Sequence, residues 1–381
     1  MYEKINLNNI GIVSKIVIPF CFVIINGSVL GNVYHTNILT SIFFLMLILK
    51  DARIDQEDYK NNGLIISNNK RIKLLCLLIL ISMILNLKFI DGLLFIILLN
   101  SFYSYYDLHF YDKEISLSSN IIMLLSIAIL VGYSSGRVLT QWNPNQIALI
   151  CCPAMFLYFF ELMSGKRNLL KVIIYIIYLY FTWKTGARSV IFGGLICFLV
   201  YRISQTKIFL NSCFVRMNII RLIAITPVII IVYNMIYLSI SSNFTMSLEL
   251  LMQKYFSKTV FTGREYIWTE WIPQLFGTKF LLIGEGERIN GNFHNLLIDI
   301  WYSFGAIFTI VYINTMFKSW KNILQKFDDK FILLSFCCFS GLFTMQSFEC
   351  LSSDTKYFFP FMYIFSAMAL GRTAYIDAYE E

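Results

Sequence analysis

The sequence predicts an all-α protein, a polytopic bundle of about twelve transmembrane helices. Only 14% of the 381 residues are charged and 57% are hydrophobic, whereas a soluble globular protein has about 25% charged residues. Apolar runs also recur along the whole chain, at lengths that suit a ~30 Å hydrocarbon core, which takes roughly 17–25 residues to cross. These runs are continuously apolar and do not alternate with polar residues, which argues against a membrane β-barrel.

Each predicted helix corresponds to one apolar run. The twelve runs lie near residues 10–30, 37–49, 73–87, 90–106, 118–134, 146–163, 171–184, 188–203, 221–241, 295–317, 331–346 and 357–376. The first run is too long for a signal-peptide core and lacks a small-residue cleavage site after it, so we expect it to be retained as a membrane span and not cleaved off. No long Gly-, Ser- or Pro-rich linker and no internal repeat divides the chain. Residues 1–381 are therefore expected to form a single membrane domain.

The distribution of Lys and Arg predicts the orientation. With the N-terminus inside and twelve spans, 21 of the 31 basic residues fall in cytoplasmic segments or in the inner ends of the spans. Cytoplasmic loops of membrane proteins carry such an excess, so both termini are predicted to be cytoplasmic. Topology and contact with anionic membrane lipid explain most of the net charge of +8. We therefore expect no nucleic-acid partner.

Three loops rich in Arg, Gly and Asn fall together on the predicted outer side. They span residues 134–145, 184–189 and 242–294, and the last is the only long outer loop. The candidate site residues in and beside these loops are Arg137, Asn145, Arg188, Arg264, Glu285, Arg288 and His294. We expect them to build a site at the outer surface.

Structural alternatives exist for several of these residues. Asn145 follows Pro144 and could serve only a turn and helix cap, and Arg188 could snorkel to the lipid headgroups. The segment after Arg264 is typical of an interfacial helix, with Trp268 and Trp271 at headgroup level. His294 could be a helix cap or a hydrogen-bond donor instead of a catalytic base.

Arginine and histidine together suit transfer from a pyrophosphate-linked donor. Guanidinium groups make bidentate contacts to phosphate oxygens and stay charged, while a histidine can accept a proton from an attacking hydroxyl. The chain has no Asp-x-Asp pair, no His-x-x-x-His and no Cys-x-x-Cys with partners. Its nine cysteines lie almost all in apolar runs, where cysteine behaves as a small hydrophobe. We therefore expect no metal and no cofactor.

The order of these motifs resembles the O-antigen polymerase and O-antigen ligase superfamily. The motifs are Asn-Pro-Asn-Gln at residues 143–146, Thr-Gly-Ala-Arg-Ser at 185–189, Thr-Gly-Arg-x-x-x-Trp at 262–268, Gly-x-Gly at 284–286 and His-Asn-Leu-Leu-x-Asp at 294–299. The resemblance covers roughly residues 130–310, and the rest of the chain matches only in being helical.

The resemblance implies a metal-independent, inverting glycosyltransferase with a GT-C-like fold in the bacterial inner membrane. Its donor would be an oligosaccharide on undecaprenyl pyrophosphate, held at the periplasmic face. Arg188 and Arg264 would then bind the pyrophosphate, and His294 would be a base or a second phosphate contact. A chain-length-regulating co-polymerase would be a possible further partner.

The sequence leaves two candidates for the acceptor molecule. A second lipid-linked repeat unit would make the protein a polymerase, which we favour, and the lipid A core would make it a ligase. Capsule polymerases share the pattern, so the polysaccharide is not identified. A transporter of lipid-linked sugars is an alternative from a different class, although no pair of interrupted helices in matching halves is visible.

Overall fold

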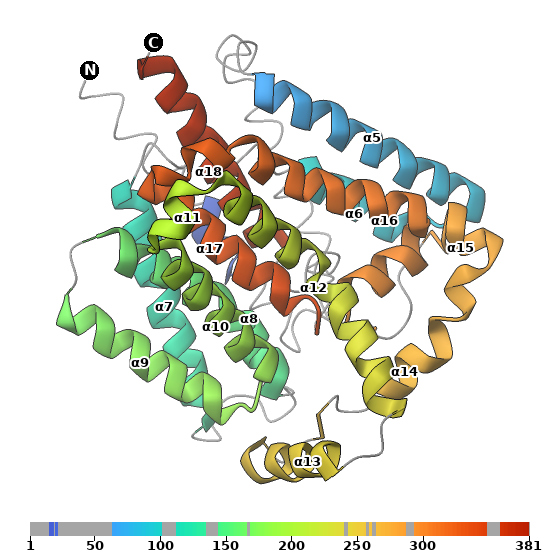
Figure 1. The fold of residues 1–381 in the computed structure, drawn as a ribbon, viewed down its shortest axis with the longest axis horizontal. Coiled ribbons are helices and arrows are strands. Elements are labelled where there is room, and N and C mark those ends of the chain that lie inside the picture. Colours follow the sequence, from blue (N-terminus) through green and yellow to red (C-terminus); the bar gives the residue numbers. More distant parts are fainter. Residues whose placement is uncertain are drawn as a thin grey trace.

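The structure is a computed structural model in which every regular element is a helix. It describes residues 15–18, 20–21, 63–100, 112–134, 144–165, 168–239, 243–256, 259–260, 264–286, 293–348 and 359–380. Among these residues there is no strand, which confirms the predicted all-α class. Figure 1 shows the arrangement.

The described helices differ widely in length. They are α5 (Gly63–Asn86), α6 (Ile90–Asn100), α7 (Asp112–Ser134), α8 (Pro144–Ser164), α9 (Leu169–Lys184), α10 (Arg188–Ser204), α11 (Lys207–Asn211), α12 (Cys213–Ser239), α13 (Asn243–Phe256), α14 (Arg264–Trp271), α15 (Thr278–Leu282), α16 (Leu296–Asn322), α17 (Lys330–Met345) and α18 (Phe359–Glu380), with the short 3-10 helices η2 (Gln274–Phe276) and η3 (Leu324–Asp328).

Four of these helices contain stretches long and apolar enough to cross a membrane. The stretches are Ile115–Ser134, Ile147–Ser164, Cys213–Tyr237 and Leu296–Asn322, and they support a membrane protein. Described helices overlap ten of the twelve predicted spans. The predicted span 37–49 lies outside the described residues, and only residues 15–18 and 20–21 of the first span are described. The count of twelve and the GT-C arrangement stay predictions.

The centre of the bundle is formed by α8 and α17. Residues 147–162 and 332–345 are buried throughout. Protein therefore surrounds these parts of the two apolar helices. Helix α10 crosses α17 where two glycines meet: a Cβ on Gly193 would lie 2.9 Å from the Gly341 carbonyl oxygen. Small residues of this kind let helix backbones approach closely. The crossing brings the start of α10 to the end of α17.

Loops that were predicted to share a side contact one another. From the predicted cytoplasmic segments, Lys326 Nζ lies 3.0 Å from Asp377 Oδ1. From the predicted outer segments, Lys279 Nζ lies 2.8 Å from Glu285 Oε2, and Lys88 Nζ lies 3.6 Å from the same oxygen. The structure thus sorts these charged groups as the topology requires, while the membrane face to which each end belongs stays a prediction.

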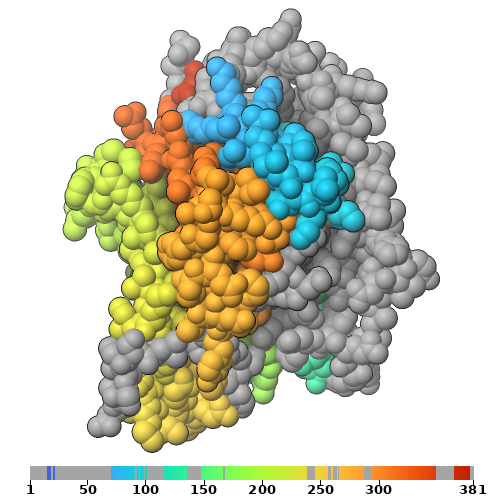
Figure 2. All heavy atoms as spheres, turned by 90° about the vertical axis from the view of Figure 1, so that its right-hand side faces the viewer, coloured from blue at the N-terminus to red at the C-terminus, as the bar shows by residue number. Residues whose placement is uncertain are grey.

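The predicted long loop contains helices of its own. Helices α15 and α14 run down the right-hand side of the molecule, and α13 lies at its lower end (Figure 1). Figure 2 shows the segment 264–286 covering this side, between α5 and α6 above and α13 below. Its contacts with α16 and α12 position the candidate site.

Candidate functional site

The structure describes four of the seven predicted site residues fully. Arg188 is the first residue of α10 and Arg264 the first of α14, and both are half-buried. His294 lies two residues before α16, and Glu285 follows α15. Asn145 is the second residue of α8, which begins at Pro144 as predicted. Arg137 and Arg288 lie outside the described residues.

A tight turn places Arg188 at the start of α10. The Thr185 hydroxyl donates to the Thr182 carbonyl oxygen at 2.7 Å and accepts from the Ala187 N–H at 3.3 Å. The Arg188 N–H donates to the Gly186 carbonyl oxygen at 3.1 Å. The helix therefore begins at the arginine itself, at the end of the bundle where α9 and α10 meet.

Arg188 lies within electrostatic range of Arg264. The positive charge of Arg264 repels the Arg188 guanidinium, and the negative charge of Glu249 attracts it. Arg188 of α10 thus lies within electrostatic range of both Glu249 of α13 and Arg264 of α14. The predicted meeting of the second and third loops is found in the structure.

Glu249 is a charged residue of the site that the sequence did not predict. Its carboxylate accepts from the Tyr237 hydroxyl at 2.5 Å and from the Val260 N–H at 3.2 Å. It thereby ties the end of α12 to the segment that leads into α14. The same carboxylate supplies negative charge to Arg188. Its position as the seventh residue of α13, between leucines, gave no signal of a shared site.

Helix α14 is held through Trp268, one turn after Arg264. Trp268 is 0% exposed, and its Nε1 donates to the Phe293 carbonyl oxygen at 2.6 Å. The predicted contact of Trp268 with lipid headgroups is excluded, because its ring is enclosed with Leu275, Phe293 and Ile298. The membrane depth of Trp268 stays a prediction. This core fixes Arg264 relative to the residue before His294.

His294 has a strained backbone and is not the cap of α16. Its φ is +55°, a left-handed conformation that costs on the order of 1–3 kcal/mol for a non-glycine residue. The cap is Asn295, whose Oδ1 accepts from the Leu297 and Ile298 N–H groups. The Asn295 amide also donates to the carbonyl oxygens of Pro227 at 3.2 Å and Ser347 at 3.1 Å. The capping alternative for His294 is therefore excluded, and the surrounding contacts maintain the strain.

The end of α17 connects His294 to Arg188. The Leu296 N–H donates to the Gln346 carbonyl oxygen at 2.9 Å, and the ring of Phe192, one turn after Arg188, lies 5.4 Å from the ring of Phe348. Both predicted site residues thus adjoin residues 346–348. The three predicted catalytic residues lie at one end of the bundle.

Glu285 belongs to a separate structural feature, an interruption of α16. Its carboxylate pairs with Lys279 and Lys88, and its N–H donates to the Tyr302 carbonyl oxygen at 2.9 Å. The Gly286 N–H donates to the Ser303 carbonyl oxygen at 2.8 Å. These carbonyls lie just before the break and would otherwise accept from the next turn of the helix.

The break itself occurs at Gly305, with φ 90° and ψ 164°. A Cβ there would lie 2.7 Å from the Leu282 carbonyl oxygen, and one on Gly284 would lie 2.6 Å from the Phe304 nitrogen. Both glycines have positive φ, so side chains are excluded by conformation and by space. The Gly-x-Gly motif at residues 284–286 therefore lets this segment pack against α16 at its break, a role that the sequence did not predict. A substrate contact by Glu285 stays a prediction.

The site is thus two arginines, one glutamate and a strained histidine at one end of the bundle. Among the residues that the structure describes, no three His, Cys, Asp or Glu side chains lie close enough to hold a metal ion. No family model, no curated protein and no solved structure matches the chain.

Proposed function

We propose that the protein is a surface-polysaccharide polymerase that transfers a glycan from undecaprenyl pyrophosphate to the hydroxyl of a second lipid-linked repeat unit. One observation supports this proposal above the others: Arg188 and Arg264, 76 residues apart in sequence, lie close enough for their charges to repel. Such a pair is unfavourable in the free protein and becomes favourable when an anion lies between the two groups.

The charge of the site suits a pyrophosphate. Glu249 supplies negative charge to Arg188, and hydrogen bonds from Tyr237 and Val260 hold its carboxylate in place. Two guanidinium groups therefore face one positioned carboxylate among these three residues. Paired guanidinium groups offer planar, bidentate donors to phosphate oxygens, and they would stabilise the negative charge that develops on a leaving pyrophosphate.

In the proposed reaction, the acceptor hydroxyl oxygen attacks the anomeric carbon of the donor sugar. A new C–O bond forms, the bond from that carbon to the pyrophosphate oxygen breaks, and its electron pair leaves with the pyrophosphate. The hydroxyl proton passes to His294, whose backbone is held at the same end of the bundle. Attack opposite the leaving group inverts the configuration. If His294 binds a phosphate instead, a carboxylate or the donor phosphate takes the proton.

A ligase would use the same donor and differ only in its acceptor, the lipid A core. A transporter of lipid-linked sugars is the second candidate, and the interruption of α16 at Gly305 favours it. Transporters place interrupted helices around their substrates, typically in pairs related by an internal repeat. Gly305 is the only such interruption among the described helices, so we place the transporter second.

Deletion of the gene followed by gel display of surface polysaccharide separates the three functions. Loss of a polymerase leaves one repeat unit on the core, loss of a ligase leaves no repeat on the core, and loss of a transporter traps lipid-linked units inside. Complementation should fail with Arg188→Lys and Arg264→Lys at normal protein levels. It should succeed with Arg202→Lys, since Arg202 is exposed at the other end of α10. Wild-type polysaccharide with Lys at both site positions would contradict the proposed arginine contacts.

A further inference from the structure

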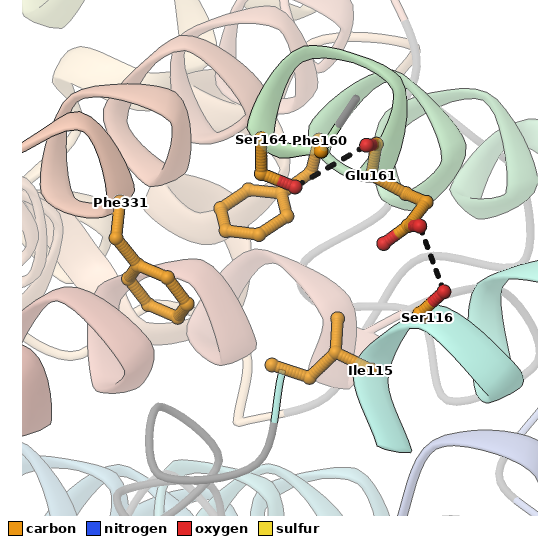
Figure 3. A pocket seen from close by; sticks show the side chains of 7 residues that line it. Ile115, Ser116, Phe160, Glu161, Ser164 and Phe331 are labelled. Carbon is orange, nitrogen blue, oxygen red and sulfur yellow. Dashed lines mark hydrogen bonds between the residues drawn. The ribbon is translucent and has the colours of Figure 1, made fainter. Parts of the chain in front are cut away.

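A cavity of about 320 Å³ lies at the opposite end of α8 from the candidate functional site. Its lining comes from the start of α7, the end of α8 and the start of α17: Ile115, Ser116, Phe160, Glu161, Ser164, Gly165 and Phe331 (Figure 3). The 21 residues of α8 span about 30 Å at 1.5 Å per residue. The cavity is therefore remote from Arg188 and His294, and the proposed glycosyl transfer does not involve it.

The charged residue in the lining of this cavity is Glu161, which is 9% exposed. Its Oε1 accepts from the Ser116 hydroxyl at 2.7 Å and from the Lys171 ammonium group. Figure 3 shows the second carboxylate oxygen directed toward the cavity. One strong acceptor is thus held in position by its neighbours, with its other oxygen available to a donor in the cavity.

Like the Glu161 carboxylate, the C-terminal end of α8 favours a cation in the cavity. Carbonyl groups at a helix C-terminus carry partial negative charge, and the Ser164 carbonyl oxygen already accepts from Lys330 Nζ at 3.3 Å. Lys171 and Lys330 therefore stand beside the cavity, with Glu161 inside it. A ligand that carries an ammonium and a phosphate a few bonds apart would match both signs of charge.

The walls and the surroundings of the cavity are apolar. Phe160 and Phe331 meet edge to face, with ring centroids 5.0 Å apart. Outside the cavity, the apolar side chains of Leu117, Leu169 and Leu170 are exposed. In a membrane protein, such a surface is covered by lipid chains. The ligand is therefore expected to be an amphiphile that arrives from the bilayer.

We propose that this cavity binds the headgroup of an ethanolamine phospholipid. The primary ammonium donates to the free oxygen of Glu161, the phosphate pairs with Lys171 and Lys330, and the glycerol lies against Phe160 and Phe331. A choline headgroup has no N–H to donate, and a glycerol headgroup has no positive charge. The cavity therefore selects the primary amine. Its volume lies at the lower end of the range for small-molecule sites.

The test compares lipids bound to the purified full-length protein by native mass spectrometry. The probes are dioleoyl phosphatidylethanolamine, phosphatidylcholine and phosphatidylglycerol, each added at the same concentration. We expect wild-type protein to retain phosphatidylethanolamine most strongly. Glu161→Gln removes the charge of the acceptor, and a charge-assisted hydrogen bond contributes enough for about tenfold in affinity.

A second variant keeps the carboxylate and fills the cavity. A Cβ on Gly165 would lie 3.4 Å from the Glu161 carbonyl oxygen, an ordinary contact, and 4.0 Å from Oε1. Gly165→Leu is therefore expected to fold and to abolish the preference by blocking access, so it decides the question even if Glu161→Gln does not fold. Equal retention of the three lipids by wild-type protein would overturn the proposal. So would stronger retention of phosphatidylglycerol, or an unchanged preference in Gly165→Leu.

Discussion

Replacing Glu249 by Gln tests whether the paired arginines are arranged to hold an anion. The Glu249 carboxylate accepts from the Tyr237 hydroxyl at 2.5 Å and the Val260 N–H at 3.2 Å, and it attracts Arg188. Glutamine keeps the size and one oxygen acceptor but loses the charge. Hydrogen bonds to charged groups contribute ~1.5–3 kcal/mol and neutral ones ~0.5–1.5 kcal/mol. We therefore expect the free energy of unfolding to fall by about 2 kcal/mol.

Inorganic pyrophosphate should recover part of this loss, because an anion between the arginines supplies the missing negative charge. The assay is thermal unfolding of the purified protein in detergent, with and without pyrophosphate at constant ionic strength. Glu270→Gln is the control, since Glu270 is exposed on α14. We expect pyrophosphate to raise the Tm of Glu249→Gln more than that of wild type or the control. Equal shifts in all three proteins would refute the reasoning.

Three further predictions concern the base, the topology and the break in α16. His294→Gln should remove most of the rate of chain extension and leave donor binding unchanged, because glutamine cannot accept the proton of the attacking hydroxyl. Weaker donor binding with the rate at saturating donor retained would make His294 a phosphate ligand. A cysteine placed between Lys254 and Lys279 should react with an impermeant thiol reagent in spheroplasts, whereas one at Asn322 should not, and the reverse pattern would overturn the orientation. Gly305→Ala should lower the free energy of unfolding by more than ~2 kcal/mol, because a Cβ at φ +90° would lie 2.7 Å from the Leu282 carbonyl oxygen. Gly165→Ala, the control, should change the free energy of unfolding little. Similar unfolding curves for the two variants would contradict the observed break.

The helical class and most helix positions could be predicted from apolar runs alone. Pro144 opens α8 and the Lys184–Ser189 segment forms a tight hairpin, as local sequence predicts. Hydropathy could not separate helices that face lipid from those surrounded by protein, because both are continuously apolar. The burial of residues 147–162 of α8 and 332–345 of α17 is therefore a result of packing that no single run of sequence encodes.

The charged residues of the site could be predicted from the sequence only in part. Arg188 and Arg264 stood out because charge is rare in this chain, and the predicted topology placed both on one side. Glu249 did not stand out, since its importance depends on the contact between α13 and the turn before α14. The enclosure of Trp268 likewise depends on residues of α16 that are distant in sequence. Such long-range contacts have no local pattern.

Chain extension by the purified protein tests the central claim most directly. Wild type, Arg264→Lys and Arg202→Lys would be reconstituted in proteoliposomes with undecaprenyl-pyrophosphate-linked repeat units, and the products would be separated by length. We predict that wild type and Arg202→Lys form polymer and release undecaprenyl pyrophosphate, while Arg264→Lys leaves single units. Absence of polymer with wild-type protein while lipid-linked units cross the bilayer, or full extension by Arg264→Lys, would contradict the account.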